Sequence, residues 1–159
     1  MRSKHSILII SGLFLHTVVF SQWVKSAGGT SADFARSIAV DGSGNVYVAG
    51  GYNGTADFDP SSGTTNLTPA GDTDIFFAKY NSSGELTWAK SLGGTSADEV
   101  YSIAVDGSGN VYVTGYFQGT VDFDPSSGTT NLTSAGSRDI FFAKYNSSGE
   151  LTWATSLGG

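Results

Sequence analysis

Cysteine is absent from the 159 residues, and the two histidines and the single methionine all lie within the first 21. The rest of the chain therefore lacks the side chains of a Ser-His-Asp or Cys-His catalytic centre, of a zinc site built on His or Cys, and of haem ligation. Disulfide bonds are excluded as well. Carboxylates, hydroxyls, amides and a few Lys, Arg and Tyr remain. We therefore expect no hydrolase with a His-assisted nucleophile or a zinc ion, and we assign no catalytic residue.

Basic residues are also scarce. Lys and Arg number 8 against 14 Asp and Glu, and two of the basic residues, Arg2 and Lys4, precede residue 22. Without them the chain has 6 basic and 14 acidic residues, a net charge of −8. Nucleic acids and anionic membranes are bound through clustered Lys and Arg. We therefore expect no nucleic-acid partner.

The N-terminus has the three parts of a secretory signal peptide. A basic start, MRSKH, is followed by the apolar run SILIISGLFLHTVVF and by the small-residue exit SQW. The run of about 15 residues is shorter than the ~20 that a membrane-spanning helix needs. We predict that residues 1–21 are cleaved and that residues 22–159 are exported, either secreted or held at the cell surface. No membrane span is expected after cleavage.

Glycine and aromatic residues are abundant instead. The chain has 22 Gly and 20 aromatic residues, with few charges, a composition typical of an extracellular all-β protein. After residue 21 no segment shows the 3.6-residue periodicity of an amphipathic helix.

The sequence repeats with a period of 65 residues. Trp23, Trp88 and Trp153 share this spacing, and residues 23–87 match residues 88–152 at 52 of 65 positions. Residues 153–159 begin a third repeat. The differences gather at 34–36, 49–53 and 72–73. A period of this kind indicates stacked units that bury their apolar faces against each other, so the recurring Trp side chains are expected to pack between units.

Each repeat contains four β-rich runs. In the first repeat they are residues 37–40, 46–51, 74–80 and 85–92, and the turn strings DGSGN and NSSG join them in pairs. Asp41 and Asp106 are expected to be Asx-turn residues in the DGSGN strings.

Both faces of these sheets require burial. Ile75 and Phe77 point to one side of their strand, whereas Phe76, Ala78 and Tyr80 point to the other. In an antiparallel sheet with one solvent-exposed face, polar and apolar residues alternate along each strand. Burial on both faces therefore indicates sheets that are stacked between neighbouring sheets. We expect an all-β fold of tandem four-stranded antiparallel blades, as in a β-propeller.

The strings SIAVDGSGNVYVAG and DIFFAKYNSSGELTWAKSLGG, with their second copies, resemble the bacterial seven-bladed β-propeller repeat family (SBBP repeats). The core IAVDGSGNVYV is similar to NHL-type propeller blades. The resemblance covers residues 23–159 and implies a propeller in exported bacterial proteins that are often large and surface-associated. It implies no single activity, because propellers have many unrelated functions.

Two features depart from a common propeller. Residues 55–73 lengthen the repeat beyond the usual ~40–50 residues, and a further hairpin is expected to pair residues 56–58 with 65–68. The mature chain supplies two blades and an orphan outer strand, Trp23–Ala27, whereas propeller rings use ~4–8 blades. We therefore expect either a longer protein with more repeats or assembly with other copies.

A ligand site is expected on the rim with the longer connections, because the opposite rim has only tight turns. The longer connections contain DFDP twice, with Asp57 and Asp59 in the first repeat and Asp122 and Asp124 in the second. The favoured interpretation is a turn in which Asp accepts backbone hydrogen bonds and Phe58 packs inward.

Two functional interpretations of the same residues remain open. Asp57, Asp59 and Ser61 fit the first, third and fifth positions of a calcium loop, but Ser62 and Thr68 stand where Gly and Glu are expected. Alternatively, carboxylates two residues apart in an extended strand are ~7 Å apart, a separation used by inverting glycosidases.

The sequence favours a non-enzymatic binding or structural module at the cell surface or outside the cell, with a protein or carbohydrate ligand. The alternatives are a carbohydrate-active enzyme based on carboxylates and a calcium-dependent ligand-binding propeller. A convergent carboxylate cluster in a pocket would favour these alternatives, and scattered, solvated Asp would favour a scaffold.

Overall fold

The computed structural model describes residues 23–159. The predicted signal peptide, residues 1–21, therefore lies outside the described residues. All regular secondary structure in residues 23–159 is β-strand. A search of the described part of the chain finds no helix with the length and apolar character needed to cross a membrane.

Thirteen strands follow one another along the chain: β1 (Gly28–Gly29), β2 (Asp33–Val40), β3 (Val46–Tyr52), β4 (Ala56–Asp57), β5 (Asn66–Leu67), β6 (Asp74–Tyr80), β7 (Leu86–Leu92), β8 (Glu99–Val105), β9 (Val111–Phe117), β10 (Thr120–Asp122), β11 (Asn131–Thr133), β12 (Asp139–Tyr145) and β13 (Leu151–Leu157).

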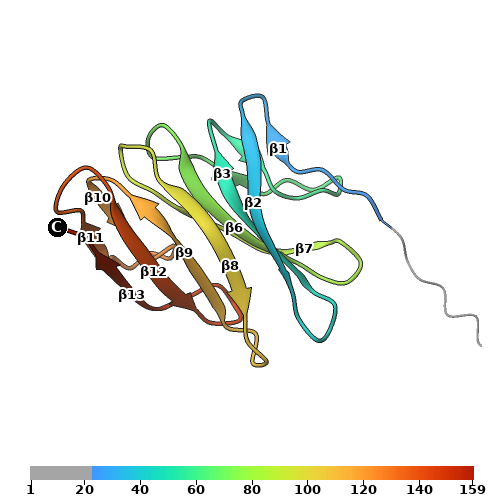
Figure 1. Ribbon diagram of the computed structural model, residues 1–159. Coiled ribbons are helices and arrows are strands. Elements are labelled where there is room, and N and C mark those ends of the chain that lie inside the picture. The colour runs from blue at the N-terminus through green and yellow to red at the C-terminus, as the bar shows by residue number, and fades with distance from the viewer. Residues whose placement is uncertain (1–22) are drawn as a thin grey trace, which may run out of the picture.

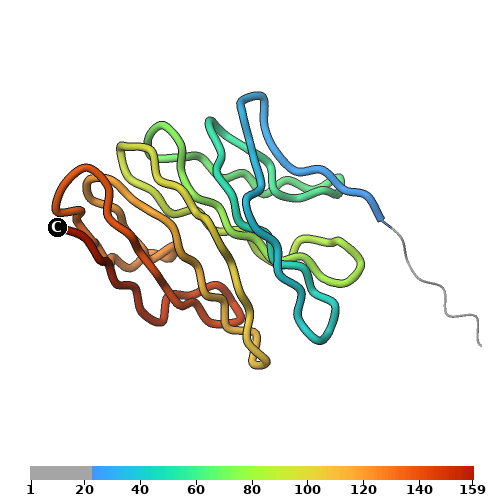
Figure 2. Tube along the Cα trace, in the orientation of Figure 1, coloured from blue at the N-terminus to red at the C-terminus, as the bar shows by residue number. Residues whose placement is uncertain are grey.

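The long strands form two four-stranded antiparallel sheets, ordered β2-β3-β6-β7 and β8-β9-β12-β13 (Figure 1). We call these sheets blade 1 and blade 2. The predicted four-stranded blades are confirmed, and the first strand of blade 1 begins four residues earlier than predicted, at Asp33. The first strands of the two blades, β2 and β8, lie side by side. The described chain starts at the blade 1 end and finishes at the blade 2 end (Figure 2).

Tight turns join the first two strands of each blade. In blade 1, Asp41 accepts hydrogen bonds from the backbone N–H groups of Ser43 (2.9 Å) and Asn45 (3.0 Å). Gly44 takes a φ of 79°, which favours glycine because it has no Cβ. Asp106 makes the same bonds in blade 2, and the Asn110 side-chain amide is the largest of the causes that lower the pKa of Asp106 to about 2. The predicted Asx-turns are confirmed.

A β-bulge interrupts the first strand of each blade. The register shifts between Ala35 and Ser37 in blade 1 and between Val100 and Ser102 in blade 2. Gly115 of β9 pairs with Val100 beside the second bulge. A Cβ at Gly115 would lie 1.9 Å from the Glu99 carbonyl oxygen, so the bulge requires glycine on the neighbouring strand.

The predicted extra hairpin is confirmed in both repeats. In blade 1, β4 pairs with β5 through Ala56–Leu67 and Asp57–Asn66. In blade 2, β10 and β11 pair over three residues. Each hairpin is also bridged to the segment that precedes its blade, through Gly28–Asp57 in blade 1 and Gly93–Asp122 in blade 2.

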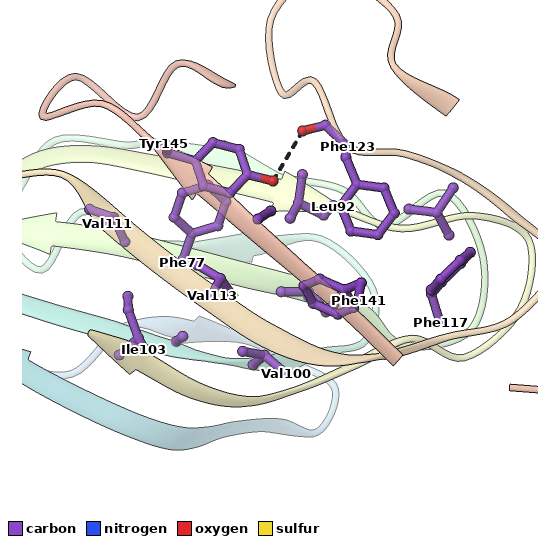
Figure 3. Close-up of a cluster of buried hydrophobic side chains, with 14 of the residues drawn as sticks. Phe77, Leu92, Val100, Ile103, Val111, Val113, Phe117, Phe123, Phe141 and Tyr145 are labelled. Atoms are coloured by element: carbon purple, nitrogen blue, oxygen red, sulfur yellow. Dashed lines mark hydrogen bonds between the residues drawn. The ribbon is translucent and has the colours of Figure 1, made fainter. Parts of the chain in front are cut away.

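The two blades pack face to face around the main hydrophobic core (Figure 3). Phe77 of β6 stacks on Tyr145 of β12 with ring centroids 4.6 Å apart. The Tyr145 hydroxyl donates a hydrogen bond of 3.0 Å to the Phe123 carbonyl oxygen. Blade 1 contributes Tyr47, Ala49, Ile75, Phe77 and Leu92, and blade 2 contributes Val100, Ile103, Val111, Val113, Phe117, Val121, Phe123, Phe141, Ala143 and Tyr145. The predicted two-sided burial therefore holds where the blades meet.

The structure corrects one prediction, at the start of the described chain. Residues 23–27 are not a strand. A strand needs a hydrogen-bonded neighbour, and residues 23–159 supply none beside this segment. Trp23 nevertheless occupies the expected position, since its Nε1 donates to the Ser82 carbonyl (3.2 Å) as Trp88 Nε1 donates to the Ser147 carbonyl (3.1 Å). The predicted packing of the recurring Trp side chains against the next blade is confirmed at both sites.

Candidate functional site

The two rims of the stacked blades, where the connections between strands lie, differ in how similar their sequences are in the two repeats. The turn rim, residues 41–45, 81–85, 106–110 and 146–150, has the same sequence in both repeats. The loop rim consists of residues 28–36, 51–74, 93–101 and 116–139. At several equivalent positions of this rim the two repeats have side chains of different size or charge. The altered pairs are Phe34 and Glu99, Ala35 and Val100, Arg36 and Tyr101, Gly51 and Tyr116, Tyr52 and Phe117, Asn53 and Gln118, Ala56 and Val121, Pro69 and Ser134, Asp72 and Ser137, and Thr73 and Arg138.

Six of these altered side chains form one contact network, which we call the variable rim cluster: Phe34, Arg36, Glu99, Tyr101, Tyr116 and Arg138. Arg36 of blade 1 reaches Glu99 of blade 2, with Nη2 and Oε2 3.4 Å apart. The Arg36 guanidinium also lies 4.7 Å from the centroid of the Phe34 ring. The altered positions of blade 1 therefore meet those of blade 2 at the joint between the blades.

The blade 2 part of the cluster is built on Tyr116. Its ring meets Tyr101 edge to face, with centroids 5.7 Å apart, and the Arg138 guanidinium lies 4.3 Å from its centroid. Burial is the main cause that raises the pKa of Tyr116, and the neighbouring Glu99 raises it further. Tyr116 is buried, whereas Tyr101 is 59% exposed.

The cluster can meet a ligand because its charged groups are accessible. The Arg36 and Glu99 side chains are 47% and 26% exposed, and Arg138 is exposed. A partly solvated ion pair of this kind contributes at most about 1 kcal/mol to folding stability. Aromatic and Arg side chains placed at a rim are therefore more useful for binding than for folding.

The DFDP loops lie on the same rim and are turns. Asp57 Oδ1 accepts hydrogen bonds from the backbone N–H groups of Asp59 (3.0 Å) and Thr65 (2.8 Å), and Asp59 Oδ1 accepts one from Ser61 (2.9 Å). Hydrogen bonds from Ser61 hold the pKa of Asp59 below its ordinary value. Phe58 is buried. The favoured turn interpretation is confirmed in this loop.

The second loop repeats the arrangement. Asp122 accepts from the N–H groups of Asp124 and Thr130, and Asp124 accepts from that of Ser126. Within residues 23–159 no three His, Cys, Asp or Glu side chains are grouped as metal ligands would be. The calcium site at Asp57, Asp59, Asp122 and Asp124 stays a prediction.

Two other carboxylates, Asp74 and Asp98, are buried where the loop rim meets the joint between the blades. The two oxygens of Asp98 accept hydrogen bonds from the backbone N–H groups of Gly94 (2.8 Å) and Gln118 (2.9 Å). The Asp98 N–H donates to the Thr73 carbonyl (2.9 Å), next to Asp74 in the chain. Asp98 therefore connects blade 1, the segment between the blades and the end of β9. Burial raises its pKa.

The carboxylate of Asp74 accepts fewer hydrogen bonds than that of Asp98. Its Oδ2 accepts a hydrogen bond of 2.7 Å from the Ala70 N–H, while its Oδ1 is buried without a partner. Burial raises the pKa of Asp74 to about 6, and the charge of Asp98 adds to the shift. A raised pKa is the property that acid catalysis would need, but Asp74 is closed to a substrate at 1% exposure. Sequence reasoning missed both residues, although Asp74 begins a predicted strand; Asp98 directly precedes the observed strand β8, which starts earlier than the pattern predicted.

Replacing Asp74 with Asn should stabilise the chain by on the order of 1–2 kcal/mol at pH 8 and by little at pH 4. The pKa of Asp74 is raised in the folded state, so between about pH 4 and 6 the folded chain holds a proton that the unfolded chain has already released. The free energy of unfolding of the unchanged chain therefore falls as the pH rises through this range. Urea unfolding at pH 4, 6 and 8 measures the difference. Asp139→Asn, the same change in blade 2, is the matched control, since Asp139 accepts the equivalent bond from Ala135 and residues 23–159 place no further blade beside it. A pH-independent gain for Asp74→Asn would contradict this account.

The repeats that form the two blades are similar to sequences of known proteins. The β-propeller repeat family SBBP matches residues 22–56 and 87–116. The chain is 34% identical over 148 residues to an uncharacterized WD repeat-containing protein of Acanthamoeba polyphaga mimivirus, which covers 86% of the chain and 11% of that protein. It is 28% identical over 144 residues to the regulatory protein FlaEY of Caulobacter vibrioides, which covers 89% of the chain and 14% of that protein. The chain thus spans about a tenth to a seventh of the length of these relatives.

Proposed function

Because the chain is built of β-propeller repeats of the SBBP family, we propose that it is a non-enzymatic binding module that contacts a protein ligand through the variable rim cluster. Its place of action is the cell surface or the space outside the cell. Export is supported by the three-part pattern of residues 1–21 and by the extracellular type of composition.

One observation carries this proposal. The repeats share 52 of 65 residues, and every turn-rim residue is identical, yet six side chains that differ in size or charge meet on the loop rim. Stacking of blades does not account for these differences, because the positions that pack in the core keep apolar residues in both repeats except where Thr114 corresponds to Ala49. Differences that fold and packing do not explain are expected where a ligand is bound.

The chemistry of the cluster fits a protein better than a sugar. Tyr and Arg are the residue types that carry most binding energy at protein interfaces. A sugar would stack on a free aromatic face, but Arg36 lies over Phe34 and Arg138 lies over Tyr116. Guanidinium groups held over aromatic rings remain free to donate hydrogen bonds to carboxylates and carbonyls of a protein partner.

Replacing Arg138 with Glu should reduce ligand capture at least tenfold. The change removes the cation beside Tyr116 and reverses the charge of the exposed cluster. Lys144→Glu is the matched control, because Lys144 lies 5.3 Å from the Tyr112 ring near the turn rim and the change in charge is the same. The probe is the set of proteins from native cell surfaces and culture medium that an immobilised chain retains, quantified by mass spectrometry.

The proposal is supported if a defined protein is retained by the unchanged chain and by Lys144→Glu but lost with Arg138→Glu. It is contradicted if all three chains retain the same proteins, or if both variants lose them equally.

A further inference from the structure

We propose that the loop rim binds an acidic segment of the partner protein through two guanidinium groups that are stacked on aromatic rings, one in each blade. Arg36 lies over Phe34 in blade 1, and Arg138 lies over Tyr116 in blade 2. We call these two pairs the stacked guanidinium sites. The inference rests on the proposed function, since it specifies what the variable rim cluster recognises in a protein ligand.

The two sites have similar geometry but are built from different positions of the repeat. The guanidinium carbon lies 4.7 Å from the ring centroid in blade 1 and 4.3 Å from it in blade 2. Because the repeats agree at 52 of 65 positions, most features that they share are copies of the same residues. This feature is shared although all four of its residues differ between the repeats, so copying does not explain why it occurs twice. The equivalents of Phe34, Arg36, Tyr116 and Arg138 in the other repeat are Glu99, Tyr101, Gly51 and Thr73.

Packing explains the aromatic rings of these sites but not the cations above them. In blade 1 the Phe34 ring covers Gly51, its partner on the neighbouring strand, where a Cβ would lie 2.5 Å from the ring. In blade 2 the equivalent pair is Glu99 and Tyr116, and the ring comes from Tyr116, which is buried. One ring fills the space at this strand pair in each blade. The guanidinium above the ring is therefore not needed for packing.

Both guanidinium groups can be reached from the loop rim. The Arg36 side chain is 47% exposed although blade 2 is packed beside it, so a blade that follows another leaves this part of the rim open. Arg138 is exposed as well, and Thr73, its equivalent in blade 1, stays partly exposed beside blade 2. Access to the two sites is therefore a property of the rim and does not depend on which blade is the last.

The charges beside Arg138 favour an anionic ligand group. The second repeat has Ser137 and Arg138 where the first has Asp72 and Thr73, which is one acid fewer and one base more. Within residues 23–159 Arg138 forms no ion pair, whereas Arg36 is paired with Glu99. The chain as a whole is acidic, but exposed charges more than about 8 Å apart are largely screened at physiological ionic strength. The nearby cations therefore decide which group binds at the rim.

A carboxylate is the anion that suits a stacked guanidinium in a protein ligand. The ring holds the planar group in one orientation, and the N–H donors at its edge can form two parallel hydrogen bonds to the two carboxylate oxygens. Neighbouring sheets lie about 10 Å apart, and an extended peptide advances about 3.3 Å per residue. Acidic residues three positions apart in an extended segment would therefore reach both sites.

Glu99 limits what can lie between the two acidic residues of the ligand. It contacts Arg36 across the joint and is the cross-strand partner of Tyr116, so its carboxylate lies between the two sites. A third acidic residue placed there would be repelled by Glu99. We therefore expect the residues between the two acids of the ligand to be neutral.

Titration with blocked peptides tests this chemistry directly. The probe is a six-residue glycine peptide with glutamate at its second and fifth positions, and the matched control has glutamine at both. We expect the glutamate peptide to bind at least about tenfold more tightly, because hydrogen bonds to a charged acceptor are the stronger ones. It should also shift the NMR signals of the Nε–H groups of Arg36 and Arg138. Equal affinities for the two peptides would overturn the proposal.

Two further probes distinguish other sources of carboxylate. An all-glycine peptide with a free C-terminus has a single carboxylate and should bind at least threefold more weakly than the glutamate peptide. Tighter binding of this probe would assign the sites to a chain terminus and contradict the proposal. An oligogalacturonate that binds at least tenfold more tightly than the glutamate peptide would assign the rim to an acidic polysaccharide and would contradict it too.

Variants that keep the charge test the stacked geometry. Arg36→Lys and Arg138→Lys should each weaken binding of the glutamate peptide at least about fivefold, because an ammonium group cannot form two parallel bonds to a carboxylate. Lys144→Arg is the control, since Lys144 lies near the turn rim, and its affinity should change less than twofold. Lysine variants that bind as tightly as the unchanged chain would show that charge alone acts at the rim and would overturn the proposal.

Chemical modification of captured proteins separates this inference from the proposed function. Proteins retained by the immobilised chain are released, and either their carboxylates are converted to amides or, as the control, their lysines are acetylated. We expect amidation to abolish recapture and acetylation to leave it intact. If capture depends on Arg138 but the amidated proteins are still retained, the rim binds protein through other groups. The inference then fails while the proposed function stands.

Discussion

Phe77→Ala is expected to lower the free energy of unfolding by about 3–5 kcal/mol, the usual loss when a large buried aromatic side chain is removed. Phe142→Ala, the same substitution in the second repeat, should cost less than about 1 kcal/mol in the monomeric chain. Phe77 is fully buried between the blades and packs on Tyr145, whereas Phe142 lies on the side of blade 2 turned away from blade 1 and is 38% exposed. The two residues occupy the same position in identical local sequences, so their difference isolates the contribution of the neighbouring blade.

Urea unfolding followed by tryptophan fluorescence measures both losses, with the slope of the transition checked for each variant. The protein is kept dilute in this experiment, so that contacts between molecules do not bury Phe142. Equal losses for the two variants would mean that blade 1 and blade 2 are not packed through β6 and β12.

Gly115→Ala should cost about 3 kcal/mol or more, and the variant is expected to fail to fold or to unfold at a much lower temperature. A Cβ at this position would lie 1.9 Å from the Glu99 carbonyl oxygen and 2.8 Å from the Val100 Cα. Both atoms belong to the backbone of the bulge in β8, so no side chain can rotate to relieve the clash.

Gly107→Ala is the matched control for this experiment. It adds the same methyl group in the turn between β8 and β9, where a Cβ would have nothing within 4 Å. We expect a change of less than about 0.5 kcal/mol, as for most surface substitutions. Thermal unfolding of both variants by circular dichroism gives the comparison. A stable Gly115→Ala chain would show that the bulge is absent or lies at another residue.

The parts of the fold that short-range chemistry determines were predictable from sequence. The turn between β2 and β3 forms because Asp41 binds the N–H groups of Ser43 and Asn45, and the string DGSGN supplies these residues together. The apolar pattern of residues 74–80 indicated burial on both faces and hence stacked blades. The hairpin of β4 and β5 was predicted from the extra length of residues 55–73 compared with a common propeller repeat.

The variable rim cluster could not be predicted in the same way. Its members come from the starts of β2 and β8, the end of β9 and the residue before β12, and they meet only because two blades stack in one register. The bulges in β2 and β8 shift the positions of Arg36 and Tyr101 relative to simple alternation. One available signal was the uneven spread of the 13 differences between the repeats. The burial of Asp74 and Asp98 had no comparable signal, since both residues are repeated unchanged at Asp139 and Asp33.

Two kinds of contact link successive 65-residue units, and each kind occurs twice in the chain with the same residue types. An indole N–H meets a serine carbonyl 59 residues later, for Trp23 with Ser82 and for Trp88 with Ser147. A glycine meets an aspartate 29 residues later, for Gly28 with Asp57 and for Gly93 with Asp122. Unequal crossing-over between the near-identical coding segments would add or remove whole 65-residue units while leaving every such link chemically unchanged. Gene length can therefore change in steps of one unit without any compensating mutation, and homologous genes are expected to differ in length by multiples of 195 nucleotides, three for each of the 65 residues of the period.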